Sequence, residues 1–277
     1  MSRTMIQAAV TMNQLQNKLD LISNNMANSQ TTGYKTREAE FSSLLFQQMN
    51  NLKNPENDEV RMTPDGIRIG SGARLGSENM NLTQGAIKNT GRALDTALLE
   101  ENYLYQIQVT ENDVTETRYT RDGAFYLSPM EDNETVMLTT SDGHPVLGAD
   151  GPIVIADGFE AISIGENGQV QVKRGNQTET AGTIEVVQAV RPNLLEATGG
   201  NMFRLPDLAE LGLDFEEIIQ NPEQNRALVQ SQALEQSNVD VAKQMSDLIL
   251  TQRSYQFNSR TISMSDQMMG LVNQLRS

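Results

Sequence analysis

Apolar side chains recur every seven residues at the start of the chain, and this spacing limits what the segment can fold into. One row is Met5, Met12, Leu19 and Met26, and an interleaved row is Ala8, Leu15, Ile22 and Ser29. Two such rows predict a helix that packs lengthwise along a partner, as in a coiled coil. An amphipathic helix lying on its own globule would show the same pattern, so the pattern leaves the partner open.

The end of the chain carries two apolar stripes on one predicted helix of about 35 residues. The first stripe steps through Val241, Met245, Leu248, Gln252, Tyr255, Ser259, Ile262, Asp266 and Met269. The second contains Leu250, Phe257, Thr261, Met264, Met268, Leu271 and Leu275. Ser237 or Asn238 is the expected N-cap, with Asp240 in the first turn. A single partner helix covers only one stripe, so this helix needs neighbours on two sides.

The middle of the chain is predicted to be β structure. Asp-Gly or Asn-Gly pairs lie at residues 122–123, 142–143, 150–151, 157–158 and 167–168, with short strand-like runs between them. Such pairs supply the positive φ angles of hairpin turns, which favours an antiparallel sandwich or barrel. Residues 207–220 are predicted to form a shorter helix.

The predicted fold class is α+β, with long N- and C-terminal helices pairing as a coiled-coil-like inner domain and a central antiparallel β-rich domain. Residues 1–36 and 233–277 are expected to be the two halves of the inner domain. Residues 37–85, rich in Asn, Gly and Pro from residue 50, are expected to be an extended connector. Residues 86–232 are expected to form the β-rich outer domain.

Charge is unevenly distributed along the chain. The net charge is −15, yet residues 1–37 carry +3 and residues 232–277 are neutral, which leaves −18 for residues 38–231. This balance argues against binding to nucleic acid or to an anionic membrane surface. No apolar run is long enough to span a bilayer, and the first residues lack the pattern of a cleavable signal peptide. We therefore expect a protein that leaves the cell, if it does, without a cleaved signal.

The chemistry of most active sites is missing from the sequence. Cysteine is absent, and the only histidine, His144, lies between a turn and a proline. The glycine-rich stretch 66–72 lacks the Gly-Lys-Ser/Thr of a phosphate-binding loop, and the acids of residues 131–134 lack the spacing of a calcium loop. We expect no catalytic residue, no cofactor and no metal.

Amide and hydroxyl side chains surround the N-terminal apolar rows, where Lys and Glu are usual on a solvated helix. If the terminal helices packed against copies of themselves, each surface charge would meet its own copy. Two like charges about 4 Å apart repel by about 4 kcal/mol at an effective dielectric near 20. Uncharged amides donate and accept hydrogen bonds and meet their own copies without repulsion. The pattern therefore favours self-packing ends, with the acidic middle outside in water.

Four stretches resemble the signatures of bacterial flagellar rod and hook proteins. LDLISNNMANSQTTGYKTREAEF (19–41) is similar to the N-terminal signature, and SNVDVAKQMSDLILTQRSYQFNSRTI (237–262) to the C-terminal one. LTQGAIKNTGRALDTAL (82–98) and RYTRDGAFYL (118–127) resemble the central motifs. The central motifs indicate the distal-rod branch with FlgG-like and FlgF-like proteins. Where the family often has a Gly-rich Phe-Phe segment after Leu-Asp-x-Ala, this chain has LLEENYL (98–104). In this departure it resembles a variant rod protein of Gram-positive bacteria.

The resemblance implies a structural subunit of the distal rod that assembles through its terminal helices into a tube, carries torque to the hook and leaves an export channel. It implies passage through the flagellar export apparatus, a place in the basal body, and other rod and hook subunits as partners, with neither nucleic acid nor a small-molecule substrate. The residues expected at the assembly interface are Met5, Met12, Leu15, Leu19, Ile22, Asn24, Asn25, Met26, Asn28, Gly33, Tyr34, Asn238, Val241, Met245, Leu248, Arg253, Tyr255, Ile262 and Met269.

Two other functions remain open at this point. A secreted scaffold or adhesin with an ordinary coiled-coil stalk would show similar terminal helices, but it would stop at a small oligomer. An enzyme acting on the cell wall is the third hypothesis, and an assay for wall hydrolysis would distinguish it.

Overall fold

The computed structural model describes residues 2–43, 47–49, 67–69, 73–111, 113–130, 134–208, 212–222 and 227–276. The chain forms two compact units, and it passes between them several times. The helical unit comprises Met1–Met26, Arg37–Asn79 and Asp240–Ser277. The β-rich unit comprises Ala27–Thr36 and Met80–Val239. The fold is thus α+β, with a helix near each end and an antiparallel β-rich centre, as predicted.

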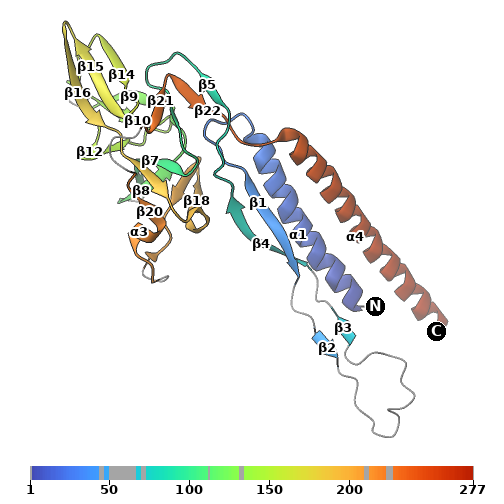
Figure 1. Ribbon diagram of the computed structural model, residues 1–277. Coiled ribbons are helices and arrows are strands. Elements are labelled where there is room, and N and C mark those ends of the chain that lie inside the picture. Colours follow the sequence, from blue (N-terminus) through green and yellow to red (C-terminus); the bar gives the residue numbers. More distant parts are fainter. Residues whose placement is uncertain are drawn as a thin grey trace. The chain divides into compact units, whose positions relative to one another are not determined.

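The helical unit contains the two long helices, α1 (Ser2–Ala27) and α4 (Val241–Arg276). They run alongside each other, with the two chain termini at the same end (Figure 1). Four strands complete this unit: β1 (Arg37–Ser43), β2 (Gln47–Met49), β3 (Ile67–Ile69) and β4 (Ala73–Met80). β1 pairs with β4, and β2 pairs antiparallel with β3, so the predicted connector folds back on itself. Its residues 50–66 lie outside the described part of the chain.

The six-stranded sheet of the β-rich unit has the order β18-β19-β8-β7-β17-β20. Its strands are β18 (Glu196–Gly199), β19 (Met202–Arg204), β8 (Val114–Thr120), β7 (Tyr103–Glu111), β17 (Val186–Ala189) and β20 (Ile219–Gln220). A short 3-10 turn, η2 (Pro192–Leu194), and a one-turn helix, α3 (Phe215–Ile218), belong to the same unit. The single helix expected over residues 207–220 is wrong, because residues 212–214 are not helical, α3 has only four residues and β20 begins at Ile219.

Two three-stranded antiparallel sheets lie in the same unit. One has the order β13-β10-β9, with β13 (Val154–Ala156), β10 (Thr135–Thr139) and β9 (Tyr126–Pro129). The other has the order β14-β15-β16, with β14 (Ala161–Ile164), β15 (Gln169–Arg174) and β16 (Gln177–Thr183). A small pair, β11 (Leu147–Gly148) and β12 (Gly151–Pro152), completes this part. The predicted turns at 142–143, 150–151, 157–158 and 167–168 have glycines with positive φ, but Gly123 does not.

Two strand pairs join distant parts of the sequence. β21 (Val229–Ser231) pairs with β6 (Thr96–Leu98), and β22 (Ala233–Glu235) pairs with β5 (Ile87–Asn89). The larger apolar core gathers side chains such as Leu98, Tyr105, Phe125 and Val229, and burying them is the main favourable term for this unit. A second core lies around Leu104, Val187 and Ile218. The chain before α4 is therefore built into the β-rich unit.

α4 begins at Val241 and has 36 residues, close to the predicted length. The expected N-cap at Ser237 or Asn238 is wrong. The Asp240 carboxylate accepts hydrogen bonds from the backbone N–H groups of Ala242 and Lys243, at 2.9 and 3.1 Å, so Asp240 is the cap. Neither helix, within the described residues, is apolar enough over a sufficient length to cross a membrane.

Candidate assembly surfaces and the buried charge cluster

Residues 27–36, here called the anchor segment, begin at the last residue of α1 but belong to the β-rich unit. The Gly33 N–H donates to the backbone oxygen of Glu235 at 2.9 Å, and the Thr32 hydroxyl donates to Asp122 at 2.9 Å. The Asn201 amide donates to the Thr32 carbonyl at 2.9 Å. Tyr34 is buried. Side-chain and backbone hydrogen bonds thus hold the segment at several points.

A buried cluster of three charges fixes the end of this segment. The Lys35 ammonium and the Arg121 guanidinium each lie 2.6 Å from a carboxylate oxygen of Glu235, and all three side chains are almost fully buried. Lys35 also donates to the Thr83 carbonyl at 2.6 Å, and the Gly85 N–H donates to Glu235 at 2.7 Å. The cluster carries a net charge of +1, and Glu235 is its only acid.

Arg121 ties the cluster to the six-stranded sheet. Its Nη1 donates to the carbonyls of Glu101 and Tyr103, at 2.6 and 2.7 Å. Its Nη2 has no hydrogen-bond partner among the described residues. Burial and, to a smaller extent, the neighbouring Arg121 lower the pKa of Lys35, and although Glu235 opposes both effects the pKa falls to about 8. Burial thus lowers the pKa of Lys35 by more than the ion pair with Glu235 raises it. One carboxylate does not fully compensate the burial of two cations.

Asn238 holds three segments of the β-rich unit together. Its side-chain oxygen accepts from the backbone N–H and the hydroxyl of Thr36, each at 2.8 Å. Its side-chain nitrogen donates to the carbonyls of Asn81 and Thr83, at 2.9 and 3.0 Å. An amide can serve both sides because it is donor and acceptor at once.

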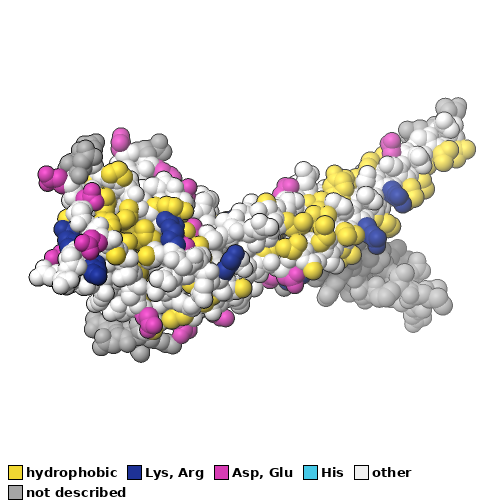
Figure 2. All heavy atoms as spheres, turned by 90° about the horizontal axis from the view of Figure 1, so that it is seen from above, with side chains coloured by type: hydrophobic (Ala, Val, Ile, Leu, Met, Phe, Trp, Pro, Cys, Tyr) yellow, Lys and Arg dark blue, Asp and Glu magenta, His cyan; other side chains and the backbone are white. Residues whose placement is uncertain are grey.

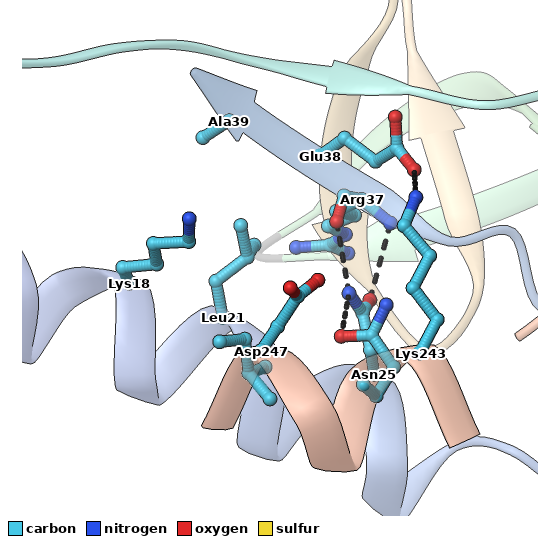
Figure 3. A pocket seen from close by; sticks show the side chains of 10 residues that line it. Lys18, Leu21, Asn25, Arg37, Glu38, Ala39, Lys243 and Asp247 are labelled. Carbon is cyan, nitrogen blue, oxygen red and sulfur yellow. Dashed lines mark hydrogen bonds and ion pairs between the residues drawn. The ribbon is translucent and has the colours of Figure 1, made fainter. Parts of the chain in front are cut away.

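Asn25 plays a matching part inside the helical unit. Its amide nitrogen donates to the Arg37 carbonyl at 2.8 Å, and its oxygen accepts from the Arg37 N–H at 3.1 Å. The same nitrogen lies 3.5 Å from the side-chain oxygen of Gln244 on α4. Figure 3 shows these bonds beside a cavity of about 160 Å³. Asn25 therefore joins α1, β1 and α4.

The cavity in Figure 3 has apolar and charged walls. Leu21 and Ile22 of α1 form apolar walls, and Lys18, Arg37, Glu38, Lys243 and Asp247 are its charged lining residues. Lys243 pairs with Glu38 at 2.9 Å, and this bond raises the pKa of Lys243. Among the described residues, no group of His, Cys, Asp and Glu is arranged to hold a metal ion.

The structure divides the residues expected at the assembly interface by burial. Leu15, Ile22, Asn25, Gly33 and Tyr34 are buried. Those that are half-buried are Met5, Met12, Leu19, Met26, Asn28, Asn238, Leu248, Tyr255, Ile262 and Met269. Those that are exposed are Asn24, Val241, Met245 and Arg253. Gly33, Tyr34 and Asn238 are thus part of the β-rich unit, where they hold the anchor segment.

Helix α4 presents an outer stripe, defined here as Leu250, Phe257, Met264, Met268, Leu271 and Leu275. All six side chains are more than half exposed. The opposite face carries the half-buried Leu248, Tyr255 and Ile262 and the buried Thr251. Figure 2 shows hydrophobic side chains gathered along the C-terminal part of α4. An apolar stripe of this length on a helix usually marks a surface that another molecule covers.

Sequence reasoning missed Arg121 and Glu235 and gave Lys35 no role. Only the position of Lys35 within the anchor segment, next to Gly33 and Tyr34, hinted at it. His144, between a turn and a proline, is half-buried, and its backbone N–H donates to the Thr140 hydroxyl at 3.3 Å. Residues 131–133, and 66 and 70–72 of the glycine-rich stretch, lie outside the described residues.

Comparisons with known proteins agree with the resemblance. Family models match for the flagella basal body rod protein (residues 7–35), the flagellar hook protein FlgE/F/G D1 domain (105–172) and the flagellar basal body rod FlgEFG protein C-terminal region (230–275). The chain is 41% identical to the flagellar hook-basal body complex protein FlhP of Bacillus subtilis over all of both chains.

Two relatives named flagellar basal-body rod protein FlgG match over nearly their full lengths. The protein from Borreliella burgdorferi is 31% identical over 100% of this chain and 99% of its own. The protein from Bacillus subtilis is 31% identical over 99% of both chains.

We predict that Glu235→Gln destabilises the β-rich unit by about 3–5 kcal/mol, because it leaves two buried cations without a counter-charge. Adding Lys35→Met to Glu235→Gln should restore part of this loss, since one cation is removed. Denaturant unfolding of wild type, both single variants and the double variant measures the effect. If the double variant is less stable than Glu235→Gln, the electrostatic explanation is wrong.

The lowered pKa of Lys35 predicts a pH dependence. The folded state loses the Lys35 proton near pH 8, and the unfolded state retains it until about 10.5. Stability should therefore rise with pH over this window, by about 1.4 kcal/mol per unit. The free energy of unfolding of wild type minus that of Lys35→Met, compared at pH 7 and 9.5, isolates the contribution. A difference that stays constant would contradict it.

Comparing Gly33→Ala with Gly91→Ala separates the cost of a positive φ angle from the cost of a steric clash with neighbouring backbone atoms. Both glycines have positive φ, +64° and +74°, but a Cβ on Gly33 would lie 2.7 Å from backbone atoms of Arg121 and Asp122, while Gly91 faces open space. We expect about 1 kcal/mol loss for Gly91→Ala and a clearly larger loss for Gly33→Ala. Faster hydrogen exchange across residues 31–36 should accompany only the second. Equal effects would exclude a role for the close contact.

Proposed function

This chain belongs to the family of flagellar basal-body rod and hook-basal-body proteins, and we propose that it is a subunit of the distal rod. The family is one of structural proteins, not of enzymes. The chain shares more identity with FlhP than with FlgG of the same bacterium, which supports a variant of the FlhP kind. Rod and hook subunits are then its partners, and the basal body outside the cytoplasmic membrane is its place.

The observation that carries the proposal is the outer stripe of α4. Its six apolar side chains are exposed in the monomer, and the side chains interspersed among them are mainly Ser, Thr and Gln, with Arg253 and Arg260. Exposed apolar area of this kind is stabilised by about 25 cal/mol per Å² when another surface covers it. In a rod, each subunit is surrounded by neighbouring subunits, and these would cover the outer stripe.

Within one copy, we propose that α1 and α4 pair as a coiled-coil-like inner domain. The buried Ala8, Leu15 and Ile22 recur every seven residues on α1, and the half-buried Leu248, Tyr255 and Ile262 recur every seven on α4. Matching seven-residue repeats are what side-by-side helices need. The interface residues predicted from the sequence keep their proposed role, in assembly directly or in holding the anchor segment.

The proposed assembly is a tube that transmits torque to the hook and leaves an export channel. Residues 1–36 and 233–277 supply its inner domain through α1 and α4, while their parts 27–36 and 233–239 attach it to the β-rich unit. Residues 37–85 connect, and residues 86–232 form the outer domain, where the charge of −18 in residues 38–231 meets solvent. In the same proposal, the protein passes through the flagellar export apparatus without a cleaved signal. It binds neither nucleic acid nor a small-molecule substrate.

We predict that Phe257→Asp abolishes polymer formation and motility, because a buried, repeated carboxylate would replace an apolar contact at every subunit. Phe257 is 70% exposed in the single chain, so the variant should fold normally. Electron microscopy of isolated basal bodies and swimming assays measure the outcome, with circular dichroism for the fold.

Val114→Asp is the matched control. Val114 is 64% exposed at the tip of the β7–β8 hairpin, so an exposed apolar side chain is again replaced by Asp, but on the other unit. Normal assembly of Phe257→Asp would refute the role of the outer stripe. A wild-type chain that stops at a small oligomer would indicate a coiled-coil scaffold or adhesin instead of a rod subunit.

A further inference from the structure

The sheet β13-β10-β9 has an uncharged outer face. Its inner face packs Leu138 and Ile155 into the core, with Leu127 and Val136 partly buried against it. The alternate positions, which share the outer face, are Tyr126, Ser128, Met130, Thr135, Met137, Thr139, Val154 and Ala156, of which Thr139 is buried. Tyr126, Met130 and Val154 are each about 40% exposed. In a stretch of chain with a charge of −18, a sheet face without any charge is unusual.

Two arginines border this face. The guanidinium of Arg92 lies over the Tyr126 ring, 4.2 Å from its centroid. Arg174 donates from Nη2 to the Ala156 carbonyl, and its Nε has no hydrogen-bond partner among the described residues. Arg92 is also paired with Asp95 at 3.0 Å. The surface is therefore apolar in the middle, with Arg174 at one margin and the Asp95-paired Arg92 at the other. Its complement is an apolar side chain flanked by carboxylates.

The chain carries such a complement on α3. Phe215 is 44% exposed, and Asp214 and Glu216 beside it are exposed. The next acid, Glu217, pairs with Arg191 at 3.3 Å. A phenylalanine left in water between two acids is placed to enter an apolar surface with a basic margin. Figure 1 shows α3 well separated from β9 and β10 within the β-rich unit, so the two surfaces cannot meet inside one copy.

We infer that the Asp214-Phe215-Glu216 knob of one copy docks on the outer face of the β13-β10-β9 sheet of the next copy. The inference rests on the proposed assembly of this chain into a rod and names a second contact in it. The two surfaces differ, so the contact is heterologous and leaves one of each free at the ends of any chain of copies. Such a contact propagates a polymer and does not close a dimer.

Charge reversal tests the contact. Arg174→Glu and Glu216→Arg should each shorten or weaken the rods, and the double variant should restore them, because the two charges are exchanged. Lys173→Glu changes the charge by the same amount at the exposed neighbouring residue and should assemble like wild type. Circular dichroism of each monomer checks that the fold is retained. Wild-type assembly by both single variants would overturn the inference and leave the proposed function intact.

Disulfide cross-linking tests the same contact without requiring a polymer. The natural chain has no cysteine, so single substitutions report one position each. Mixed full-length Ser128→Cys and Glu216→Cys chains should cross-link at least several-fold faster than either chain alone. Asp150→Cys, at an exposed turn, should not cross-link faster with either variant.

Equal rates for mixed and single variants would refute the contact. Rapid cross-linking by chains that never form rods would support the contact and contradict the proposed function. The two ideas therefore fail separately.

Discussion

The β-rich unit depends on one buried negative charge. Glu235 pairs with both Lys35 and Arg121, and it lies at the end of β22, shortly before α4 begins. Burying two cations without it would be strongly unfavourable, because each loses its water and gains no counter-charge. The anchor segment after α1 is thus held in place by a residue 200 positions later in the chain. Both ends of the β-rich unit must be present before either is stable.

The sequence predicted features that repeat locally and missed those that depend on long-range contacts. Seven-residue apolar spacing shows in a single helix, so both helices and the length of α4 could be predicted. Glu235, Arg121 and Lys35 are separated by 114 and 200 positions and form no local pattern. The glycine of 122–123 was explained wrongly for the same reason. Gly123 lies where a Cβ would be 1.9 Å from the Thr96 carbonyl oxygen, a close approach that only the fold creates.

Burial also distinguishes the two apolar rows of α1, because the sequence pattern alone does not show which row is buried. Ala8, Leu15 and Ile22 are buried, whereas Met5, Met12, Leu19 and Met26 are half-buried at the margin. The stronger apolar row by composition is the methionine-rich one, but the smaller Ala8 permits closer approach of a neighbouring helix. Which row packs is decided by the neighbour's shape, and α4 contributes the polar Gln244 and Thr251 among its buried positions. The seven-residue periodicity gives the spacing of apolar side chains along a helix, but it does not give the shape of the helix's partner.

In the proposed assembly, the apolar helix contacts and the charged contact on the β-rich unit would have different roles. An apolar stripe that repeats every seven residues binds almost as well after a slip of about 10 Å, because each residue adds 1.5 Å along a helix. Uncharged amide neighbours do not oppose such a slip, since they find new partners at many geometries. A knob of three residues between two arginines has one position only. Apolar helices would therefore hold copies together, and the charged contact on the β-rich unit would set their register.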